Sequence, residues 1–231
     1  MSAPARLRRV LRSGVGRGAR RARRALDRRS GDRASPAPSP ADEFFADLRA
    51  RHPRFPTAVA ADARACAARS ATLDVPHGRR ATGRLILHLL AESDGFAGLM
   101  AYRAKARLQG LGVPVLPRVC HYVAMVTGQV CIGDPVFVAP GLCLPHGQIV
   151  IDGIVVVGPG VTIGPFVTLG LVKSKGVAGP TIEGGAVLGA GTKALGPVVV
   201  GAGATVIPNS VVVRDVPPGA IVGGIPARPR N

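Results

Sequence analysis

The sequence predicts a mainly β solenoid, in which short strands wind into stacked coils, preceded by an α-helical segment. An aliphatic residue returns every six positions in the last hundred residues, and the fourth position after it is usually small or branched. Aromatic residues make up only 3% of a chain that is 47% hydrophobic and lacks Trp, which indicates a narrow aliphatic core. At 231 residues the chain can bury such a core without disulfides.

Residues 1–40 form an Arg/Pro-rich arm that we expect to be disordered. Residues 1–33 hold 12 Arg against Asp27 and Asp32, which accounts for +10 of the net charge of +17. The Pro-rich stretch that follows cannot sustain a helix or strand. Contact with nucleic acid or an anionic membrane surface is one interpretation of the charge. We prefer a second interpretation, in which the excess of Arg and Ala reflects a GC-rich genome or a translation start site assigned too far upstream. No aromatic residues interleave with the arginines to stack on bases, which weakens the nucleic-acid interpretation.

Residues 41–130 are predicted to be an α-helical segment, because their apolar residues recur at helical spacing. Phe44, Phe45 and Leu48 start this pattern, and an Ala-rich stretch over residues 57–71 continues it. Asp94 is expected to cap a helix that ends at the glycines of positions 110 and 112. A last apolar helix over residues 119–126 leads to the solenoid.

Residues 131–231 form the predicted solenoid domain. The hexad positions slip by one residue after Leu144 and are interrupted between Leu169 and Ile182, where seven residues more than one hexad must loop out. Glycine often follows the aliphatic position, as a tight corner would favour. The repeated aliphatic positions are Ile132, Val138, Leu144, Ile151, Val157, Ile163, Leu169, Ile182, Leu188, Ala194, Val200, Val206 and Val212, and the fourth positions after them are Val136, Leu142, Val155, Val161, Val167, Ala186, Thr192, Val198, Ala204 and Ser210.

The four cysteines never form a close pair, so we expect them to be reduced and mostly buried. No apolar run approaches the roughly 18 to 20 residues of a membrane span, and the N-terminus lacks the apolar stretch of a secretory signal. We therefore expect a cytoplasmic protein.

The hexads resemble those of the hexapeptide-repeat acyltransferases, and the nearest branch is the serine acetyltransferases. The segments that carry the resemblance are 144–147 (Leu-Pro-His-Gly), 167–170 (Val-Thr-Leu-Gly) and the ending from Asp215 to Arg228. The resemblance covers residues 95–228. It implies a left-handed parallel β-helix with three hexads per coil, a homotrimer or a dimer of trimers, and acetyl-CoA as the acyl donor.

His146 is the leading catalytic candidate because it is the only histidine in the solenoid and lies near a corner, where its side chain can point outward. Acyl transfer to a hydroxyl needs a base that works near pH 7, and imidazole suits this role. The backbone N–H of Gly147 or of the 170–176 loop is a candidate donor to the oxyanion. By resemblance, His146 is the general base of a direct transfer without an acyl-enzyme.

The remaining candidates follow from the resemblance. The extra loop between residues 170 and 180 is expected to reach a neighbouring subunit and cover the active site, although a plain surface loop is the alternative. Backbone and cationic groups along the later coils are expected to hold the donor. The candidates for the acetyl-CoA site are Gly170, Lys173, Lys175, Gly189, Ala190, Lys193 and Ala204, and those for the acceptor site are Pro145, Gly147, Asp134, Asp152 and Gly179.

Three departures from the family put the acceptor in doubt. Serine acetyltransferases have an Asp where this chain has Pro145, another Asp where it has Cys131, and Arg-His-Pro where it has residues 178–180 (Ala-Gly-Pro). These positions recognise serine or assist its activation. Their loss leaves His146 without an evident carboxylate, and Asp134 and Asp152 are the nearest acidic residues that we could name.

The function predicted from the sequence is an acetyl-CoA-dependent O-acetyltransferase that acts on a hydroxyl of a small metabolite or sugar. Serine O-acetylation is the first alternative. The γ-type carbonic anhydrases share the predicted fold, but they bind Zn²⁺ through several histidines and the solenoid has one, so no metal is expected. A non-catalytic scaffold with a nucleic-acid-binding arm is the alternative from another class.

Overall fold

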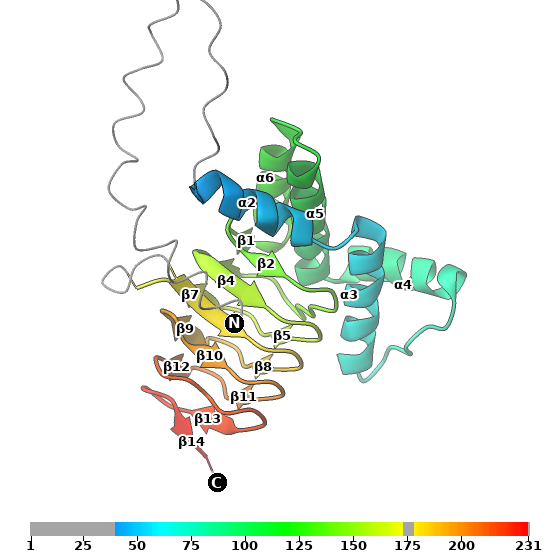
Figure 1. Cartoon of the computed structure of the whole chain (residues 1–231). Coiled ribbons are helices and arrows are strands. Elements are labelled where there is room, and N and C mark those ends of the chain that lie inside the picture. The colour runs from blue at the N-terminus through cyan, green and yellow to red at the C-terminus, as the bar shows by residue number, and fades with distance from the viewer. Residues whose placement is uncertain (1–39, 173–177, 231) are drawn as a thin grey trace, which may run out of the picture. The chain divides into compact units, whose positions relative to one another are not determined.

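A computed structural model of the chain describes residues 40–172 and 178–230 (Figure 1). The predicted disordered arm and the loop lysines Lys173 and Lys175 lie outside the described residues. The chain divides into two units between residues 48 and 49, a point inside helix α2 (Pro40–Arg51). The second unit holds the helices and strands described below.

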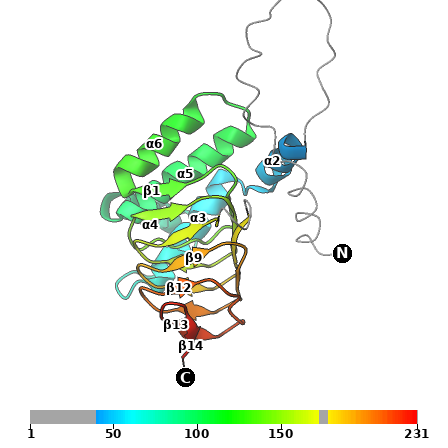
Figure 2. The same ribbon diagram turned by 90° about the vertical axis from the view of Figure 1, so that its left-hand side faces the viewer.

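Four helices follow α2 in the predicted helical segment: α3 (Phe55–Arg69), α4 (Arg79–Glu92), α5 (Asp94–Gly110) and α6 (Leu116–Gly128). Proline stands in the first turn of α3 and α6, where its missing N–H costs nothing. Ser93, rather than Asp94, is the N-cap of α5, and its hydroxyl accepts from the Phe96 N–H. Helices α5 and α6 lie side by side over the start of the solenoid (Figure 2).

No helix in the described part of the chain is long and apolar enough to span a membrane.

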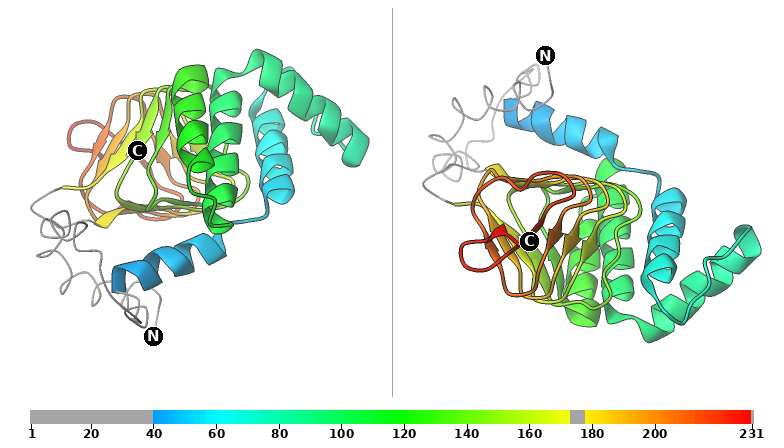
Figure 3. Two further views of the ribbon diagram at one scale, coloured as in Figure 1. Left: turned by 90° about the horizontal axis from the view of Figure 1, so that it is seen from above. Right: turned by 90° about the horizontal axis from the view of Figure 1, so that it is seen from below.

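From residue 130 the chain winds through short strands that form three sheets, so that successive coils stack on one another (Figure 3). The first sheet has the order β1-β3-β6-β9-β12, the second β10-β7-β4-β2 and the third β14-β13-β11-β8-β5. All neighbours pair in parallel except β13 and β14. The strands are β1 (Val130–Ile132), β2 (Phe137–Val138), β3 (Ile149–Ile151), β4 (Ile154–Val157), β5 (Thr162–Ile163), β6 (Thr168–Gly170), β7 (Ala178–Ile182), β8 (Val187–Leu188), β9 (Lys193–Leu195), β10 (Val199–Val200), β11 (Thr205–Val206), β12 (Val211–Val212), β13 (Ile221–Gly223) and β14 (Arg228–Pro229).

The strand register confirms both the three-hexad coil and the seven-residue insertion. Val187 pairs with Thr205, 18 residues further on, which is three hexads. One coil earlier Thr162 pairs with Val187, 25 residues further on. The difference of seven residues equals the insertion predicted between Leu169 and Ile182, and it lies between β6 and β7.

The core of the solenoid consists of the residues that the hexad pattern selects. Every predicted aliphatic position from Ile132 to Val212 exposes at most 1% of its surface, and the fourth positions expose at most 4%. The fourth positions include two polar residues, Thr192 and Ser210, which are fully buried. The interior is therefore filled by side chains, as the shortage of aromatic residues indicated.

The glycines that follow the aliphatic positions are needed for a different reason from the one predicted. Gly164, Gly189 and Gly201 do not have positive φ angles. Instead, a Cβ on each would lie 2.4–2.8 Å from backbone atoms of the next coil, so a side chain does not fit. Left-handed backbone is found two residues later, for example at Gly191 and Gly203.

Side chains from α3 and α5 bind the backbone edge of the first coil, which has no coil above it. From α5, Tyr102 donates to the Val136 carbonyl, Arg103 to the carbonyls of residues 138 and 139, and Lys105 to that of residue 132. From α3, Asp62 accepts from the N–H groups of residues 141 and 142. We call Asp62, Tyr102, Arg103 and Lys105 the first-coil cap.

Candidate active site

His146 lies on the corner that leads into β3, where the one-residue slip in the hexad pattern occurs. Its side chain is 70% exposed, while Leu144 before it and Ile149 after it are fully buried. Gln148 adopts a left-handed conformation with φ 62°, which turns the chain back into the regular coil. The extra residue of the slip therefore pushes the imidazole out of the solenoid.

A carboxylate that we did not predict for this role lies next to His146. Asp94, the first residue of α5, has its Oδ1 atom 3.7 Å from the Nδ1 atom of His146. The same Oδ1 accepts from the Gly95 N–H at 2.8 Å, and Oδ2 accepts from the Gly147 N–H at 3.2 Å. Because this N–H is already used by Asp94, Gly147 is a poor candidate for the oxyanion donor.

Three glycines let the helix ends approach the His146 corner this closely. A Cβ on Gly147 would lie 1.6 Å from the Gly128 carbonyl oxygen, and one on Gly128 would lie 2.4 Å from the Asp94 carbonyl oxygen. A Cβ on Gly95 would lie 2.5 Å from the Leu144 carbonyl oxygen. The start of α5, the end of α6 and the corner are thus in backbone contact.

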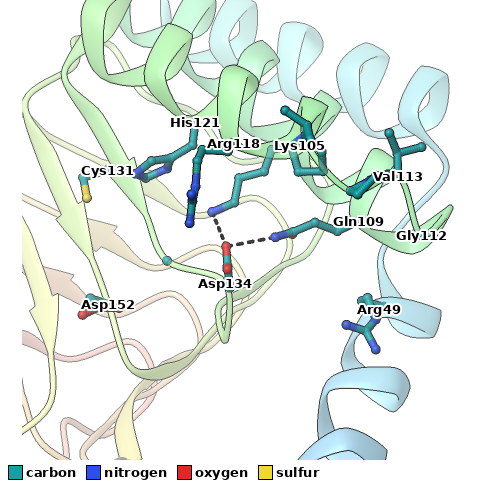
Figure 4. Close-up of a pocket in the computed structure, with 14 residues that line it drawn as sticks. Arg49, Lys105, Gln109, Gly112, Val113, Arg118, His121, Cys131, Asp134 and Asp152 are labelled. Carbon is teal, nitrogen blue, oxygen red and sulfur yellow. Dashed lines mark hydrogen bonds and ion pairs between the residues drawn. The ribbon is translucent and has the colours of Figure 1, made fainter. Parts of the chain in front are cut away.

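The predicted acceptor residues Asp134 and Asp152 line a cavity of about 790 Å³ beneath α5 and α6 (Figure 4). Asp134 Oδ1 binds Lys105 Nζ at 2.7 Å and Gln109 Nε2 at 3.0 Å. Partial burial opposes ionisation of Asp134, but these two hydrogen bonds outweigh it, so the pKa of the carboxyl is lowered. Asp134 is therefore hydrogen-bonded to two side chains of α5 and not to His146.

The same cavity contains residues that the sequence did not single out as a group. Arg118 and His121 project from α6, and Cys131 projects from β1 (Figure 4). Burial, followed by the nearby charge of Lys105, lowers the pKa of His121, so its imidazole is neutral at pH 7. Among the described residues no group of three or more His, Cys, Asp or Glu side chains is arranged to hold a metal ion.

Two further predicted acceptor residues, Pro145 and Gly179, have no side-chain group that can hydrogen-bond to a ligand. Pro145 is exposed beside His146, whereas Gly179 is buried in β7. A Cβ on Gly179 would lie 2.6 Å from the Val155 side chain, so this glycine is explained by packing between coils.

The described residues predicted for the acetyl-CoA site fall into two groups. Lys193 is exposed on β9, with its Nζ 3.5 Å from both the Phe166 carbonyl and Thr168 Oγ1, and Gly170 ends β6 with no close neighbour at its Cβ position. The other residues are part of the coil stack. The N–H of Gly189 bonds to the Val206 carbonyl, Ala190 accepts from Asn209, and the Ala204 side chain is fully buried.

No family model matches the chain. Among curated proteins it is 34% identical to serine acetyltransferase of Synechococcus elongatus over 144 residues, which are 62% of this chain and 59% of that protein. It is also 34% identical to serine acetyltransferase of Escherichia coli K12 over 136 residues, which are 58% of this chain and 50% of that protein. The chain thus spans between half and three fifths of these relatives.

Solved structures cover more of the chain. Serine acetyltransferase from Vibrio cholerae matches with a TM-score of 0.67 and 30% identity over 84% of this chain and 73% of that one. The Neisseria gonorrhoeae enzyme in complex with serine matches with a TM-score of 0.66 and 28% identity, covering 86% and 78%. A serine acetyltransferase in complex with CoA matches with a TM-score of 0.66 and 26% identity, covering 85% and 79%. These likenesses fit a left-handed β-helix with an N-terminal helical region.

Proposed function

Because this chain belongs to the serine acetyltransferase-like branch of the hexapeptide-repeat acyltransferases, we propose that it transfers an acetyl group from acetyl-CoA to a hydroxyl acceptor. The observation that carries the proposal is the single exposed solenoid histidine, His146, on the corner before β3. It supplies a base on a corner that the ends of α5 and α6 approach closely, because Gly95, Gly128 and Gly147 have no Cβ.

In this proposal the imidazole of His146 takes the hydroxyl proton while the acceptor oxygen attacks the thioester carbonyl carbon. The tetrahedral intermediate then collapses, the carbon–sulfur bond breaks, and the CoA thiolate takes the proton from the imidazolium. The acetyl group passes directly to the acceptor oxygen, and no acyl-enzyme forms. Lys193, exposed on β9, is the described cation that we assign to the donor phosphates.

The comparisons favour serine as the acceptor over the broader sugar or small-metabolite hydroxyl that we preferred from the sequence. The curated relatives are serine acetyltransferases, and one matching structure is a complex with serine. We therefore propose serine O-acetylation as the first activity to test. A different hydroxyl acceptor stays as the second candidate, because Cys131, Pro145 and residues 178–180 replace the groups that assist serine in the family.

The test measures thiol release from acetyl-CoA with serine, sugars and nucleotide sugars offered separately. Turnover with serine supports the first candidate, and turnover only with another acceptor supports the second. His146→Ala should abolish turnover, whereas His88→Ala, which removes an exposed histidine of α4, should retain it. Absence of thiol release with every acceptor, or full activity of the His146→Ala variant, would contradict the proposal.

The proposal includes a homotrimer, as the resemblance implies. Helix α6 supports an interface between copies, because it exposes an apolar stripe at helical spacing. Val119, Tyr122 and Val126 on this stripe are 48%, 62% and 83% exposed. Sedimentation velocity should give three times the chain mass of 23.6 kDa, or six times for paired trimers, and a monomer would overturn this part of the proposal.

A further inference from the structure

We propose that Asp94 is the positioning residue of His146: its carboxylate holds the Nδ1–H side of the imidazole, so that Nε2 faces the acceptor hydroxyl. This inference rests on the proposed function, in which His146 is the base. Asp94 would thereby supply the carboxylate that the residues next to His146 in the sequence lack.

The Asp94 carboxylate is anchored on both sides by backbone N–H groups. Oδ2 of Asp94 accepts from the N–H of Gly147, the residue that follows His146, and Oδ1 accepts from the N–H of Gly95 in the same helix. The carboxylate is therefore tied to the corner that carries the imidazole and to the first turn of α5. The oxygen that faces Nδ1 is the one held by the helix, at 3.7 Å from the ring nitrogen.

The backbone that carries Asp94 is packed tightly against the His146 corner. Gly95, Gly128 and Gly147 each lack room for a Cβ, because the start of α5, the end of α6 and the His146 corner touch through backbone atoms. Replacement of any of the three would push these elements apart. The separation of 3.7 Å is slightly longer than a hydrogen bond, as catalytic contacts often are before the substrate binds.

Asp94 stands in the first turn of α5, where the N-terminal end of the helix dipole favours a negative side chain. Within residues 40–172 and 178–230, Asp94 is the only carboxylate at ion-pair distance from His146. The two acidic alternatives lie in the cavity, where Asp134 binds Lys105 and Gln109.

Together these features give the carboxylate two functions in the reaction. It fixes the neutral tautomer with the proton on Nδ1 and the lone pair on Nε2, and it stabilises the imidazolium that forms when Nε2 takes the hydroxyl proton. It acts on the acceptor only through His146.

The first test compares Asp94→Asn with wild type and with the matched control Glu92→Gln, an exposed acid at the end of α4. We expect kcat of Asp94→Asn to fall by about 10-fold to 100-fold, as for other groups that orient a catalytic side chain, with the KM for acetyl-CoA within about 2-fold of wild type. The urea midpoint of Asp94→Asn should stay close to that of wild type, because the amide keeps the shape of the side chain. A purely structural residue would instead lower the midpoint and leave kcat of the folded chain near that of wild type.

The second test needs no variant. With ¹⁵N-labelled imidazole, the NMR signals of neutral His146 in the wild-type chain should be those of a protonated Nδ1 and an unprotonated Nε2. The opposite tautomer would overturn the inference, as would Asp94→Asn with kcat within 2-fold of wild type. If wild type releases no thiol with any acceptor, the proposed function fails, while the tautomer measurement still decides the role of Asp94.

Discussion

The ion pair between Asp62 and Arg103 in the first-coil cap makes a strong prediction for Asp62→Asn. Arg103 donates from Nε to Oδ2 at 2.8 Å and from Nη2 to Oδ1 at 3.0 Å. Both side chains are at most 2% exposed. The substitution keeps the shape of the side chain but leaves the Arg103 guanidinium buried without its counter-charge.

The expected loss in the free energy of unfolding is about 3 to 5 kcal/mol, the usual cost of breaking one side of a buried pair. That is a large share of the roughly 5 to 15 kcal/mol that holds a typical domain together. Because the chain has no Trp, urea unfolding should be followed by far-UV circular dichroism. The control is Asp74→Asn, an exposed acid between α3 and α4, which should change the free energy of unfolding by no more than about 0.5 kcal/mol. A loss below about 1 kcal/mol for Asp62→Asn would show that the ion pair does not hold the helices on the first coil.

Three further predictions follow from single residues. Burial, then the charges of Arg103, Lys105 and Arg51, lower the pKa of His52 from its usual value of 6.5 to about 4. The unfolded chain therefore takes up the proton first, so the free energy of unfolding should fall as the pH drops from 6.5 to about 4, and thermal melts of His52→Gln should show a flatter pH dependence. Thr192 Oγ1 is buried with no hydrogen-bond partner among the described residues, whereas the Ser210 hydroxyl donates to the Ile207 carbonyl and accepts from the Gly224 N–H. In urea, the free energy of unfolding should rise by about 1 kcal/mol in Thr192→Val and fall by about 1 kcal/mol in Ser210→Ala. A change in the same direction in both variants would refute this prediction. Gly147→Ala should abolish turnover because its Cβ would overlap the Gly128 carbonyl oxygen, while Gly83→Ala, with open space at its Cβ, should keep full turnover in the same thiol assay.

The solenoid could be predicted closely because its six-residue repeat is visible in the sequence. Each hexad places one aliphatic side chain inside, so the period alone identifies the buried residues from Ile132 to Val212. The helical segment has no such repeat. Helix α4 was not predicted as a separate element, because its contacts are made by a few residues such as Leu85 and Leu89, against α3 and Phe96 of α5.

The active-site candidate could be predicted only in part. His146 is evident in the sequence, because it is the only histidine among the hexads. Asp94 precedes it by 52 residues, and its position beside the imidazole depends on how α5 and α6 dock on the first two coils. The sequence signal was present in the glycines at 95, 128 and 147, but what they contact can be seen only in three dimensions.

The first-coil cap also affects whether two copies of the chain can associate edge to edge through their β-strands. The outermost strands of a stacked parallel sheet carry unpaired backbone groups, and such an edge is a template for strands of another chain. Here Tyr102, Arg103 and Lys105 occupy carbonyls of that edge, and Asp62 occupies two of its N–H groups. A second β-helix therefore cannot add its strands there without displacing the helices. The helical segment thus protects this end of the solenoid against fibre growth.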